Sequence, residues 1–271
     1  MIFVLDTNIL VHQFWHMANT KSDGDPDLAD VLDWILIRLD NLKRYLDDLS
    51  AQHGGGEVKR VAVFDSTKSS FRKELVEEYK QQRTRVAGVY ELVADTKEAV
   101  ISSDDWIGLI APDGYEADDL IASIAHQASE PVIIHSSDKD FNQCLQDGKV
   151  GIIKRSGIDE PIVNQHGIPL GGEMIARHYR ERDLIREYGF GADRWVDYQC
   201  LVGDVADNVK GCRGVGPKRA KELLTKYDSF FEVTDDDLNK LQRANWQEWL
   251  EDVDKLREVF TLRTDLDFRL E

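Results

Sequence analysis

The chain has few cysteines, no long apolar run and a deficit of positive charge, and each shortage excludes a class of protein. Its three cysteines, Cys144, Cys200 and Cys212, are far apart and form no CxxC pair, so neither a disulfide scaffold nor a zinc site is expected. No stretch is long enough to span a bilayer, and the apolar start is interrupted by Asp6 and lacks a basic leader. We therefore expect a cytoplasmic protein with reduced thiols and no membrane association.

The charge balance limits the partners that the chain can have. Its 271 residues include 51 acidic and 34 basic ones, for a formal net charge of −17. This balance disfavours a polyanionic partner, so nucleic-acid binding would need local basic patches. With 42% hydrophobic residues, the chain can bury a large core, in one domain or in one domain with an appendage.

Acidic residues recur after short apolar runs that are typical of buried parallel strands, or at the start of an apolar helix. The carboxyl ends of parallel strands share one edge of a sheet, so these acids are expected to converge there. They are Asp6, Asp65, Glu116, Asp118, Asp119, Asp138, Asp140, Asp204 and Asp207.

One acidic group at a helix start has a simpler explanation, because Asp and Glu cap free amides and suit the helix dipole. Recurrence after several strands favours a common site instead. Two carboxylates about 4 Å apart repel by roughly 4 kcal/mol at an effective dielectric near 20, so such a cluster needs cations. Oxygen ligands select hard ions, which makes Mg²⁺ or Mn²⁺ the expectation.

The alternation of strands and helices predicts an α/β core over residues 1–165, with a mainly parallel sheet flanked by helices, and a helical part over residues 166–271. A long amphipathic helix is expected at residues 27–49, and mostly helical residues between Asp65 and Asp104. Strands are expected at residues 2–5, 60–64, 106–110, 131–135 and 150–153, the last with a hairpin partner at 161–163.

Two basic patches follow. The first holds Arg72, Lys80 and Arg83 among several glutamates, and for this segment alone a solvated helix face is the better explanation. The second, residues 209–227, has six basic residues against Glu222 alone. Its glycines lead into Pro217, an arrangement that presents backbone amides to phosphate and grips a nucleic-acid backbone without reading bases. The residues expected to bind there are Lys210, Gly211, Arg213, Gly214, Gly216, Lys218 and Arg219.

Taken in order, these motifs resemble the flap endonuclease or 5'-nuclease family, and above all its bacterial and phage branch related to the N-terminal domain of DNA polymerase I. The resemblance covers nearly the whole chain. The motifs that carry it are Phe64-Asp65, Phe71-Arg72, Tyr79-Lys80, Arg83, Glu116-Ala117-Asp118-Asp119, Asp138-Lys139-Asp140, Gly203-Asp204 with Asp207-Asn208, Gly211 to Lys218, and Leu262 to Leu266.

The resemblance implies a PIN-like 5'-nuclease fold with a helical arch at about 66–104 and a helix-hairpin-helix type motif at about 193–227. It implies 5'-3' exonuclease and 5'-flap endonuclease activity by two-metal-ion hydrolysis of DNA, in replication or repair. One ion would be held by Asp6, Asp65, Glu116 and Asp118, and the other by Asp138, Asp140 and Asp204. Asp119 and Asp207 would support the site indirectly, through bound water or through contacts with the residues that bind the ions.

By the same resemblance, Lys80 and Arg83 would contact the scissile phosphate, and Lys80 and Arg72 would offset charge in the transition state. The hairpin would hold duplex and is a candidate K⁺ site. The substrate would be DNA with a 5' single-stranded end or flap beside duplex, with an RNA primer on DNA as a further candidate. A monomer and a separate DNA polymerase partner are expected.

Some features depart from the family. Asp6-Thr7-Asn8 is also how PIN-type ribonucleases begin, and no proline-rich stretch follows Arg83. Two alternatives therefore stay open: a PIN-type ribonuclease, which would not need the glycine hairpin, and a non-catalytic protein that binds branched DNA, which would be expected to lack some of the acids.

Overall fold

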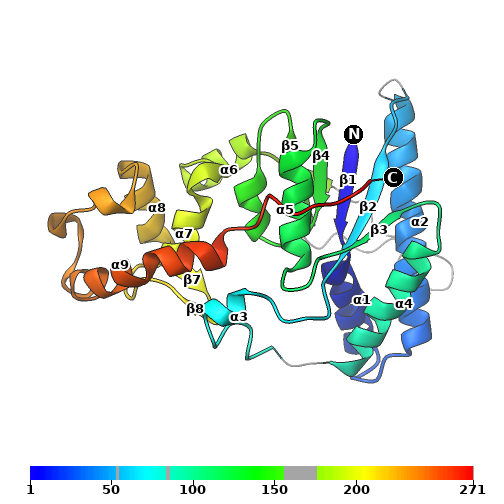
Figure 1. The fold of residues 1–271 in the computed structure, drawn as a ribbon, viewed down its shortest axis with the longest axis horizontal. Coiled ribbons are helices and arrows are strands. Elements are labelled where there is room, and N and C mark those ends of the chain that lie inside the picture. Colours follow the sequence, from blue (N-terminus) through cyan, green and yellow to red (C-terminus); the bar gives the residue numbers. More distant parts are fainter. Residues whose placement is uncertain (53–54, 84–85, 156–175, 271) are drawn as a thin grey trace.

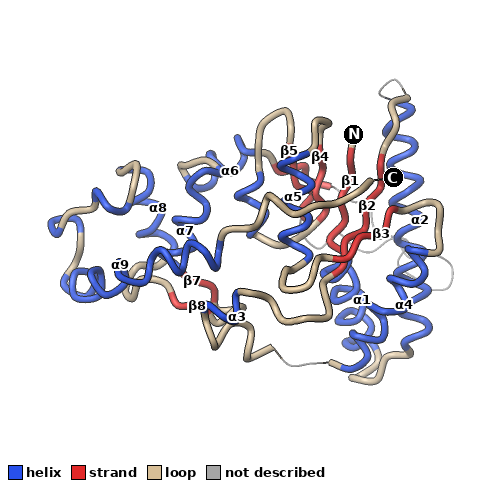
Figure 2. The backbone as a smooth tube through the Cα atoms, in the orientation of Figure 1, coloured by secondary structure: helices blue, strands red, loops and turns tan. Residues whose placement is uncertain are grey.

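A six-stranded sheet forms the centre of the protein, in the strand order β3-β2-β1-β4-β5-β6 (Figure 1, Figure 2). The structure is a computed structural model that describes residues 1–52, 55–83, 86–155 and 176–270. Strands β1 to β5 are parallel, and β6 pairs antiparallel with β5. The strands are β1 (Ile2–Asp6), β2 (Lys59–Phe64), β3 (Ile107–Ile110), β4 (Val132–His135), β5 (Val150–Arg155) and β6 (Ala176–Tyr179).

The predicted mainly parallel sheet is therefore confirmed, and β1 to β5 begin and end within two residues of the expected positions. The antiparallel partner of β5 differs from the prediction. It is β6 (Ala176–Tyr179), whereas the strand expected at residues 161–163 lies outside the described residues.

Successive side chains of a strand point to opposite faces of the sheet, so alternate residues of each central strand are buried on each face. Phe3 and Leu5 of β1 pack in one apolar cluster with α1 (Thr7–Lys21), α2 (Leu28–Gln52) and α4 (Ala87–Ile101). Ile2 and Val4 pack in the other cluster, which includes α5 (Ala117–Gln127). Helix α2 is the one predicted at 27–49, and no helix among the described residues is long and apolar enough to cross a membrane.

The stretch from Asp65 to Asp104 is less helical than predicted. Among its described residues, helix occurs at α3 (Arg72–Leu75) and at α4, while residues 76–83 form turns. Helix α4 does not stand apart from the core, because its apolar residues Val89, Leu92 and Val100 are buried against α1, α2 and β3. The difference arises because a run of charged residues does not distinguish helix from turn, whereas buried apolar residues at helical spacing stabilise α4.

The C-terminal part is mainly helical, as predicted, and lies beside the sheet domain in Figure 1. Trp246 and Trp249 of its longest helix are buried in the core, and the Trp249 Nε1 donates to the Cys200 carbonyl at 2.9 Å. Its elements are α6 (Glu181–Tyr188), α7 (Trp195–Val202), β7 (Gly203–Asp204), β8 (Val209–Lys210), α8 (Pro217–Lys226) and α9 (Lys240–Phe260), with 3-10 turns η1 (Asp140–Cys144), η2 (Ala192–Arg194), η3 (Phe230–Glu232) and η4 (Asp235–Asp237).

An extended segment after α9 ties this helical part back to the sheet domain, where it crosses α5 (Figure 1). Gln127 on α5 donates to the carbonyls of Thr264 and Leu266, both at 3.0 Å. The Leu266 amide in turn donates to the Ser123 Oγ at 3.1 Å. These bonds use the polar positions of a helix whose other face is buried on the sheet, so the two parts share one packed unit.

Candidate active site

Five of the predicted acids come together at the carboxyl edge of the parallel sheet. Asp6 ends β1, Asp65 follows β2, Asp138 and Asp140 follow β4, and Asp118 lies in the first turn of α5. Burial raises the pKa of Asp6 to about 7, and the charges of Asp65 and Asp138 add to the rise. Burial and the neighbouring Asp6 and Asp138 also raise the pKa of Asp118 well above its ordinary value. The acids are therefore close enough to oppose one another's ionisation.

Local hydrogen bonds fix Asp6 at the point where the strand turns into helix. Its carboxylate caps α1 by accepting from the Ile9 amide at 3.1 Å, and the Ser136 Oγ donates to its other oxygen at 2.9 Å. The cap explanation weighed against a metal role for such acids therefore holds in part for Asp6. Because Asp6 is 3% exposed and still surrounded by carboxylates, capping alone does not account for its position.

Three side chains donate hydrogen bonds to Glu116. Its Oε1 accepts from the Lys80 Nζ at 2.6 Å, and its Oε2 accepts from the Tyr79 hydroxyl at 3.0 Å and from the Arg72 Nη1 at 3.2 Å. Glu116, Tyr79 and Asp207 raise the pKa of Lys80 well above its usual value, although burial opposes the charge. Lys80 is thus held as a cation at the edge of the acid cluster.

The structure corrects the role predicted for Arg72. Its side chain is 2% exposed and does not face the open edge of the site. The guanidinium binds both oxygens of Asp119, each at 2.7 Å, and its Nε donates to the Val259 carbonyl at 2.8 Å. Desolvation excludes a charged group from the interior unless it is paired in this way. Arg72 therefore supports Glu116 from behind, rather than offsetting charge on a substrate.

Asp119 is likewise placed for support and not for direct metal binding. It is fully buried, and its oxygens also accept from the amides of Glu116 and Arg263, each at 3.0 Å. This matches the indirect role expected for Asp119. The contact with Arg263 explains the closing motif Leu262 to Leu266, since this segment joins the site through its backbone.

Asp204 and Asp207 reach the same cluster from the C-terminal part. The Lys139 Nζ lies 2.9 Å from the Asp204 Oδ2, and the Ala206 amide donates to the Asp204 Oδ1 at 2.7 Å. Asp207 pairs with Arg83. Burial, followed by the charges of Asp138, Asp207 and Asp204, raises the pKa of Asp140 to about 8. The acids from both halves of the chain thus form one continuous edge, named the acid rim below.

The donor set of the acid rim fits hard divalent cations, which favour carboxylate oxygens. As arranged, no three carboxylate, His or Cys side chains in the described part of the chain are grouped to hold an ion, and Glu116, Asp204 and Asp207 are paired with lysine or arginine. Two buried amide oxygens at the rim, those of Asn8 and Gln199, have no hydrogen-bond partner among the described residues. Such oxygens are suited to the waters that Mg²⁺ retains.

Asn8, Tyr79 and Gln199 support the rim, and of these only Gln199 lies outside the sequence motifs. Asn8 donates to Asp65, and the Gln199 Nε2 donates to the Asp140 Oδ1 at 2.7 Å. Tyr79 is buried, and its hydroxyl donates to Glu116. The position of Asn8, two residues after Asp6, could have suggested that its amide lies near the acids. Gln199 is distant from Asp140 in sequence, so only the fold brings it there.

The predicted hairpin lies between α7 and α8 and depends on backbone packing. Gly203 and Gly211 face each other across β7 and β8, and a Cβ at either glycine would collide with the backbone of the opposite strand. Gly214 has φ +91°, which glycine adopts without strain. At Gly216, which precedes Pro217 at the start of α8, an added Cβ would meet nothing within 4 Å.

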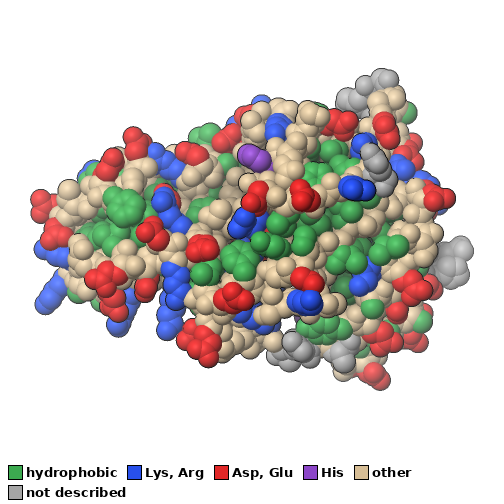
Figure 3. Space-filling model, in the orientation of Figure 1, with side chains coloured by type: hydrophobic (Ala, Val, Ile, Leu, Met, Phe, Trp, Pro, Cys, Tyr) green, Lys and Arg blue, Asp and Glu red, His purple; other side chains and the backbone are tan. Residues whose placement is uncertain are grey.

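The basic residues of the hairpin fall into two groups. Lys210, Arg213 and Lys218 are exposed and have no ion pair among the described residues. Arg219 differs from the prediction, because it pairs with Glu222 at 2.8 Å and donates to the Asp237 carbonyl, so it holds α8 to the following loop. Figure 3 shows Lys and Arg side chains projecting from this C-terminal part.

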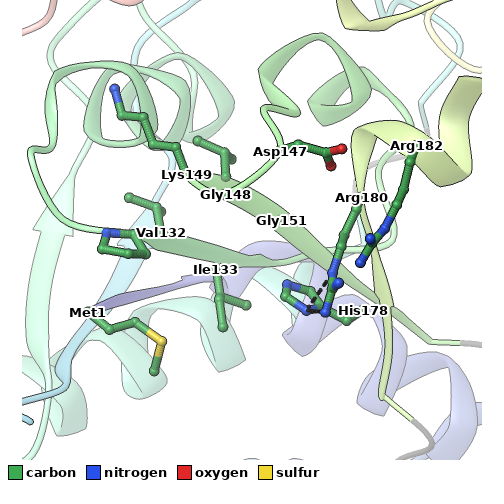
Figure 4. Close-up of a pocket in the computed structure, with 12 residues that line it drawn as sticks. Met1, Val132, Ile133, Asp147, Gly148, Lys149, Gly151, His178, Arg180 and Arg182 are labelled. Atoms are coloured by element: carbon green, nitrogen blue, oxygen red, sulfur yellow. Dashed lines mark hydrogen bonds between the residues drawn. The ribbon is translucent and has the colours of Figure 1, made fainter.

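A cavity of about 450 Å³ lies away from these residues (Figure 4). It is lined by Met1, Pro131 and Lys149, which precede β1, β4 and β5, and by His178 and Arg180. These strand starts form the edge of the sheet opposite the acid rim. None of the predicted site residues lines it, so the cavity is not the predicted site.

Comparison with known proteins decides the family. Residues 1–169 match the model for the "5'-3' exonuclease, N-terminal resolvase-like domain", and residues 190–271 match the model for the "5'-3' exonuclease, C-terminal SAM fold". The chain belongs to the 5'-3' exonuclease family. The resemblance inferred from the motifs is thereby confirmed.

Relatives of this 5'-3' exonuclease family member include a 5'-3' exonuclease of Aquifex aeolicus, 31% identical over 78% of this chain and 66% of that protein. The thermostable DNA polymerase I of Thermus aquaticus is also 31% identical, over 78% of this chain and 23% of the polymerase. The chain thus spans somewhat under two thirds of the first relative and about a quarter of the second.

Solved structures share the fold. A structure of the 5'-exonuclease of bacteriophage T5 with divalent zinc ions has a TM-score of 0.66 at 20% identity, covering 97% of this chain and 90% of that one. A complex of the T5 flap endonuclease with DNA and metal ions has a TM-score of 0.62 at 20% identity, covering 97% and 88%. The predicted 5'-nuclease fold is confirmed by these matches.

Proposed function

We propose that the protein is a structure-specific 5'-nuclease that hydrolyses DNA phosphodiesters with two divalent metal ions, Mg²⁺ or Mn²⁺, and acts as a 5'-3' exonuclease and 5'-flap endonuclease. The observation that carries the proposal is the acid rim, in which acids from both halves of the chain raise one another's pKa beside a half-buried lysine, Lys80. A surplus of carboxylates that costs folding energy is explained by cation binding. Membership of the family supports the same activity.

The acid rim would hold the two ions. Asp6, Asp65, Glu116 and Asp118 are proposed for one, and Asp138, Asp140 and Asp204 for the other. Bound there, the ions would supply an activated water and stabilise charge on the phosphate. Asp119 and Asp207 are proposed to act indirectly, since Arg72 and Arg83 bind their carboxylates.

Lys80 and Arg83 are proposed to receive the scissile phosphate. Both cations lie at the junction between the acid rim and the hairpin, and the Lys80 Nζ is 2.6 Å from Glu116 and 4.0 Å from Asp207. A cation held at the open edge of an acidic site attracts phosphate oxygens and stabilises their charge during reaction. The side chain of Arg83 is 56% exposed and can reach outward toward the strand.

The hairpin is proposed to hold the duplex next to the cleaved strand. Lys210, Arg213 and Lys218 are exposed and can contact phosphates, and no side chain among the described residues caps the start of α8. This arrangement reads shape and backbone, so the junction between duplex and a 5' single strand would set the cleavage position. K⁺ at the hairpin, an RNA primer as substrate, a monomeric state and a separate polymerase partner belong to the same proposal.

A cleavage assay tests the function against its two alternatives. End-labelled 5'-flap DNA and a matched RNA hairpin are incubated with the protein, with and without Mg²⁺. Metal-dependent release of short 5' products from DNA is the expected result. Cleavage of RNA alone would identify a PIN-type ribonuclease, and tight DNA binding without products would identify a non-catalytic binding protein.

A further inference from the structure

Two strained residues face each other where the sheet domain meets the hairpin. Among the described residues, three that are not glycine have positive φ: Asp23 at 54°, Lys80 at 55° and Asn208 at 58°. Such a conformation costs energy and persists where the surroundings enforce it, often at functional sites. Lys80 and Asn208 belong to segments 128 positions apart in sequence, yet both lie at one junction, because their segments are joined by hydrogen bonds.

Three hydrogen bonds to backbone carbonyls join the turn of residues 78–83 to the loop of residues 205–208, beside the ion pair of Arg83 with Asp207. The Lys80 amide donates to the Asp207 carbonyl at 2.9 Å. The Asn208 Nδ2 donates to the Glu78 carbonyl at 3.1 Å, and Gln82 donates to the Val205 carbonyl. These bonds hold the backbone on both sides of Lys80, and we call them the junction latch.

The direction of the Lys80 side chain depends on this latch. With φ near +55°, the backbone directs the Lys80 side chain differently from an extended or helical residue, and its Nζ reaches Glu116 at 2.6 Å. Free of the latch, a lysine avoids this conformation, because its Cβ meets the backbone carbonyl. The position of the cation therefore depends on the loop of the C-terminal part as well as on the turns of its own segment.

Resting on the proposed function, we propose that Asn208 is a positioning residue that couples the hairpin to Lys80. Asn208 directly precedes β8 and lies three positions before Gly211, so the segment that would grip duplex is continuous with the latch. Its side-chain amide fixes Glu78, and the neighbouring Asp207 carbonyl fixes the Lys80 backbone. A hairpin seated on duplex thereby holds Lys80 in the place where the phosphate of the cleaved strand arrives.

Two variants remove the donor in different ways. Asn208→Gly keeps the left-handed backbone accessible and deletes the amide, while Asn208→Asp keeps the size and replaces the donor with an acceptor. We expect each to lower the single-turnover cleavage rate of 5'-flap DNA about 10- to 100-fold, as misplacement of a reacting group by about 1 Å does. The dissociation constant for duplex should stay within two-fold of wild type. Asp23→Gly, which removes the remote positive-φ side chain, is the matched control and should cleave at the wild-type rate.

A double-mutant cycle with Lys80→Ala shows whether Asn208 acts through Lys80. If it does, Asn208→Gly causes no further loss in the Lys80→Ala background. An equal loss in both backgrounds, a wild-type rate for Asn208→Gly, a slow Asn208→Asp beside a normal Asn208→Gly, or a matching fall in duplex affinity would each overturn the proposal.

A second readout does not require cleavage. The Lys80 side chain is 18% exposed and paired with Glu116, so an amine-acylating reagent should label it slowly. Peptide mass spectrometry is expected to show labelling of Lys80 at least about three-fold faster in Asn208→Gly than in wild type or Asp23→Gly. Should the wild type prove inactive on DNA, this measurement still decides the coupling, and equal labelling rates would refute it.

Discussion

The acid rim and the glycine hairpin are built on opposite principles. At the rim, side chains carry the chemistry, and their charges oppose one another so strongly that burial and neighbours raise the pKa of Asp6 and Asp140 to about 7 and about 8. At the hairpin, the backbone carries the shape, because Gly203 and Gly211 touch across β7 and β8 with no room for a methyl group. A change of charge should therefore matter most at the rim, and a change of volume most at the hairpin.

The largest expected effect on cleavage comes from a substitution that changes the acid rim and leaves the hairpin intact. Asp140→Asn keeps the size of the side chain and an oxygen that accepts from Gln199, but it removes a charge proposed to hold a metal ion. We expect cleavage of 5'-flap DNA to fall about 10³-fold, since a metal ion contributes several kcal/mol to the barrier. Single-turnover kinetics with saturating enzyme measure this, and duplex affinity in the same buffer should change less than two-fold. Cleavage at the normal rate would remove Asp140 from the proposed metal site.

A single methyl group tests the hairpin. Gly211→Ala would place a Cβ against the backbone of Gly203 and Leu201, so we expect a loss of about 3 kcal/mol in the free energy of unfolding. Gly216→Ala is the matched control, because an added Cβ there meets nothing within 4 Å and should cost less than about 1 kcal/mol. Urea unfolding of both variants gives the comparison. Equal stability would show that the two glycines do not need their close approach.

The charges of the acid rim should also make the free energy of unfolding depend on pH. Because the pKa of Asp6 is about 7 in the folded protein and 3.8 as its ordinary value, the folded state binds its proton more tightly than the unfolded state does. Metal-free protein should therefore lose stability as pH rises from about 4 to about 8, by on the order of a few kcal/mol. Thermal unfolding in a chelator at pH 5 and pH 8 measures the loss, and added Mg²⁺ should restore stability at pH 8.

Asp6→Asn provides the control for that experiment. Asparagine still caps α1, but it carries no charge to be repelled by Asp65 and Asp138. The variant should be more stable than wild type without metal, by a small margin at pH 5 and by a larger one at pH 8. A wild-type pH profile in Asp6→Asn would mean that other acids dominate the repulsion.

The smallest expected effect is electrostatic and belongs to the hairpin. Lys218→Ala removes an exposed cation, so duplex binding should weaken and the slope of log K against log salt should become shallower by about one unit. Lys97→Ala on α4, far from the hairpin in the fold, should leave the slope unchanged. Titrations over a range of salt concentrations separate the two. An unchanged slope in Lys218→Ala would exclude Lys218 from phosphate contact.

The sequence alone determined the sheet, because apolar runs and their alternation are local properties of strands buried on both faces. It also placed Asp6, Asp65 and Asp138 at one edge, since parallel strands end on the same side. It did not predict α1, although Asp6 followed by Leu10, Val11 and Phe14 has the cap and spacing of a helix. In residues 76–83 it favoured helix where turns occur, because charge pattern was the only guide there.

Only the tertiary structure decided which basic side chain pairs with which acid. Arg72 and Lys80 lie eight positions apart in one basic segment, yet Arg72 is buried behind Glu116 and Lys80 lies at the open edge. The assignment depends on Asp119 and the Val259 carbonyl, and on the Asp207 carbonyl, which approach from distant segments. Local pattern fixes what a residue can do, but the desolvation and pairing that select its role come from groups brought near by the fold.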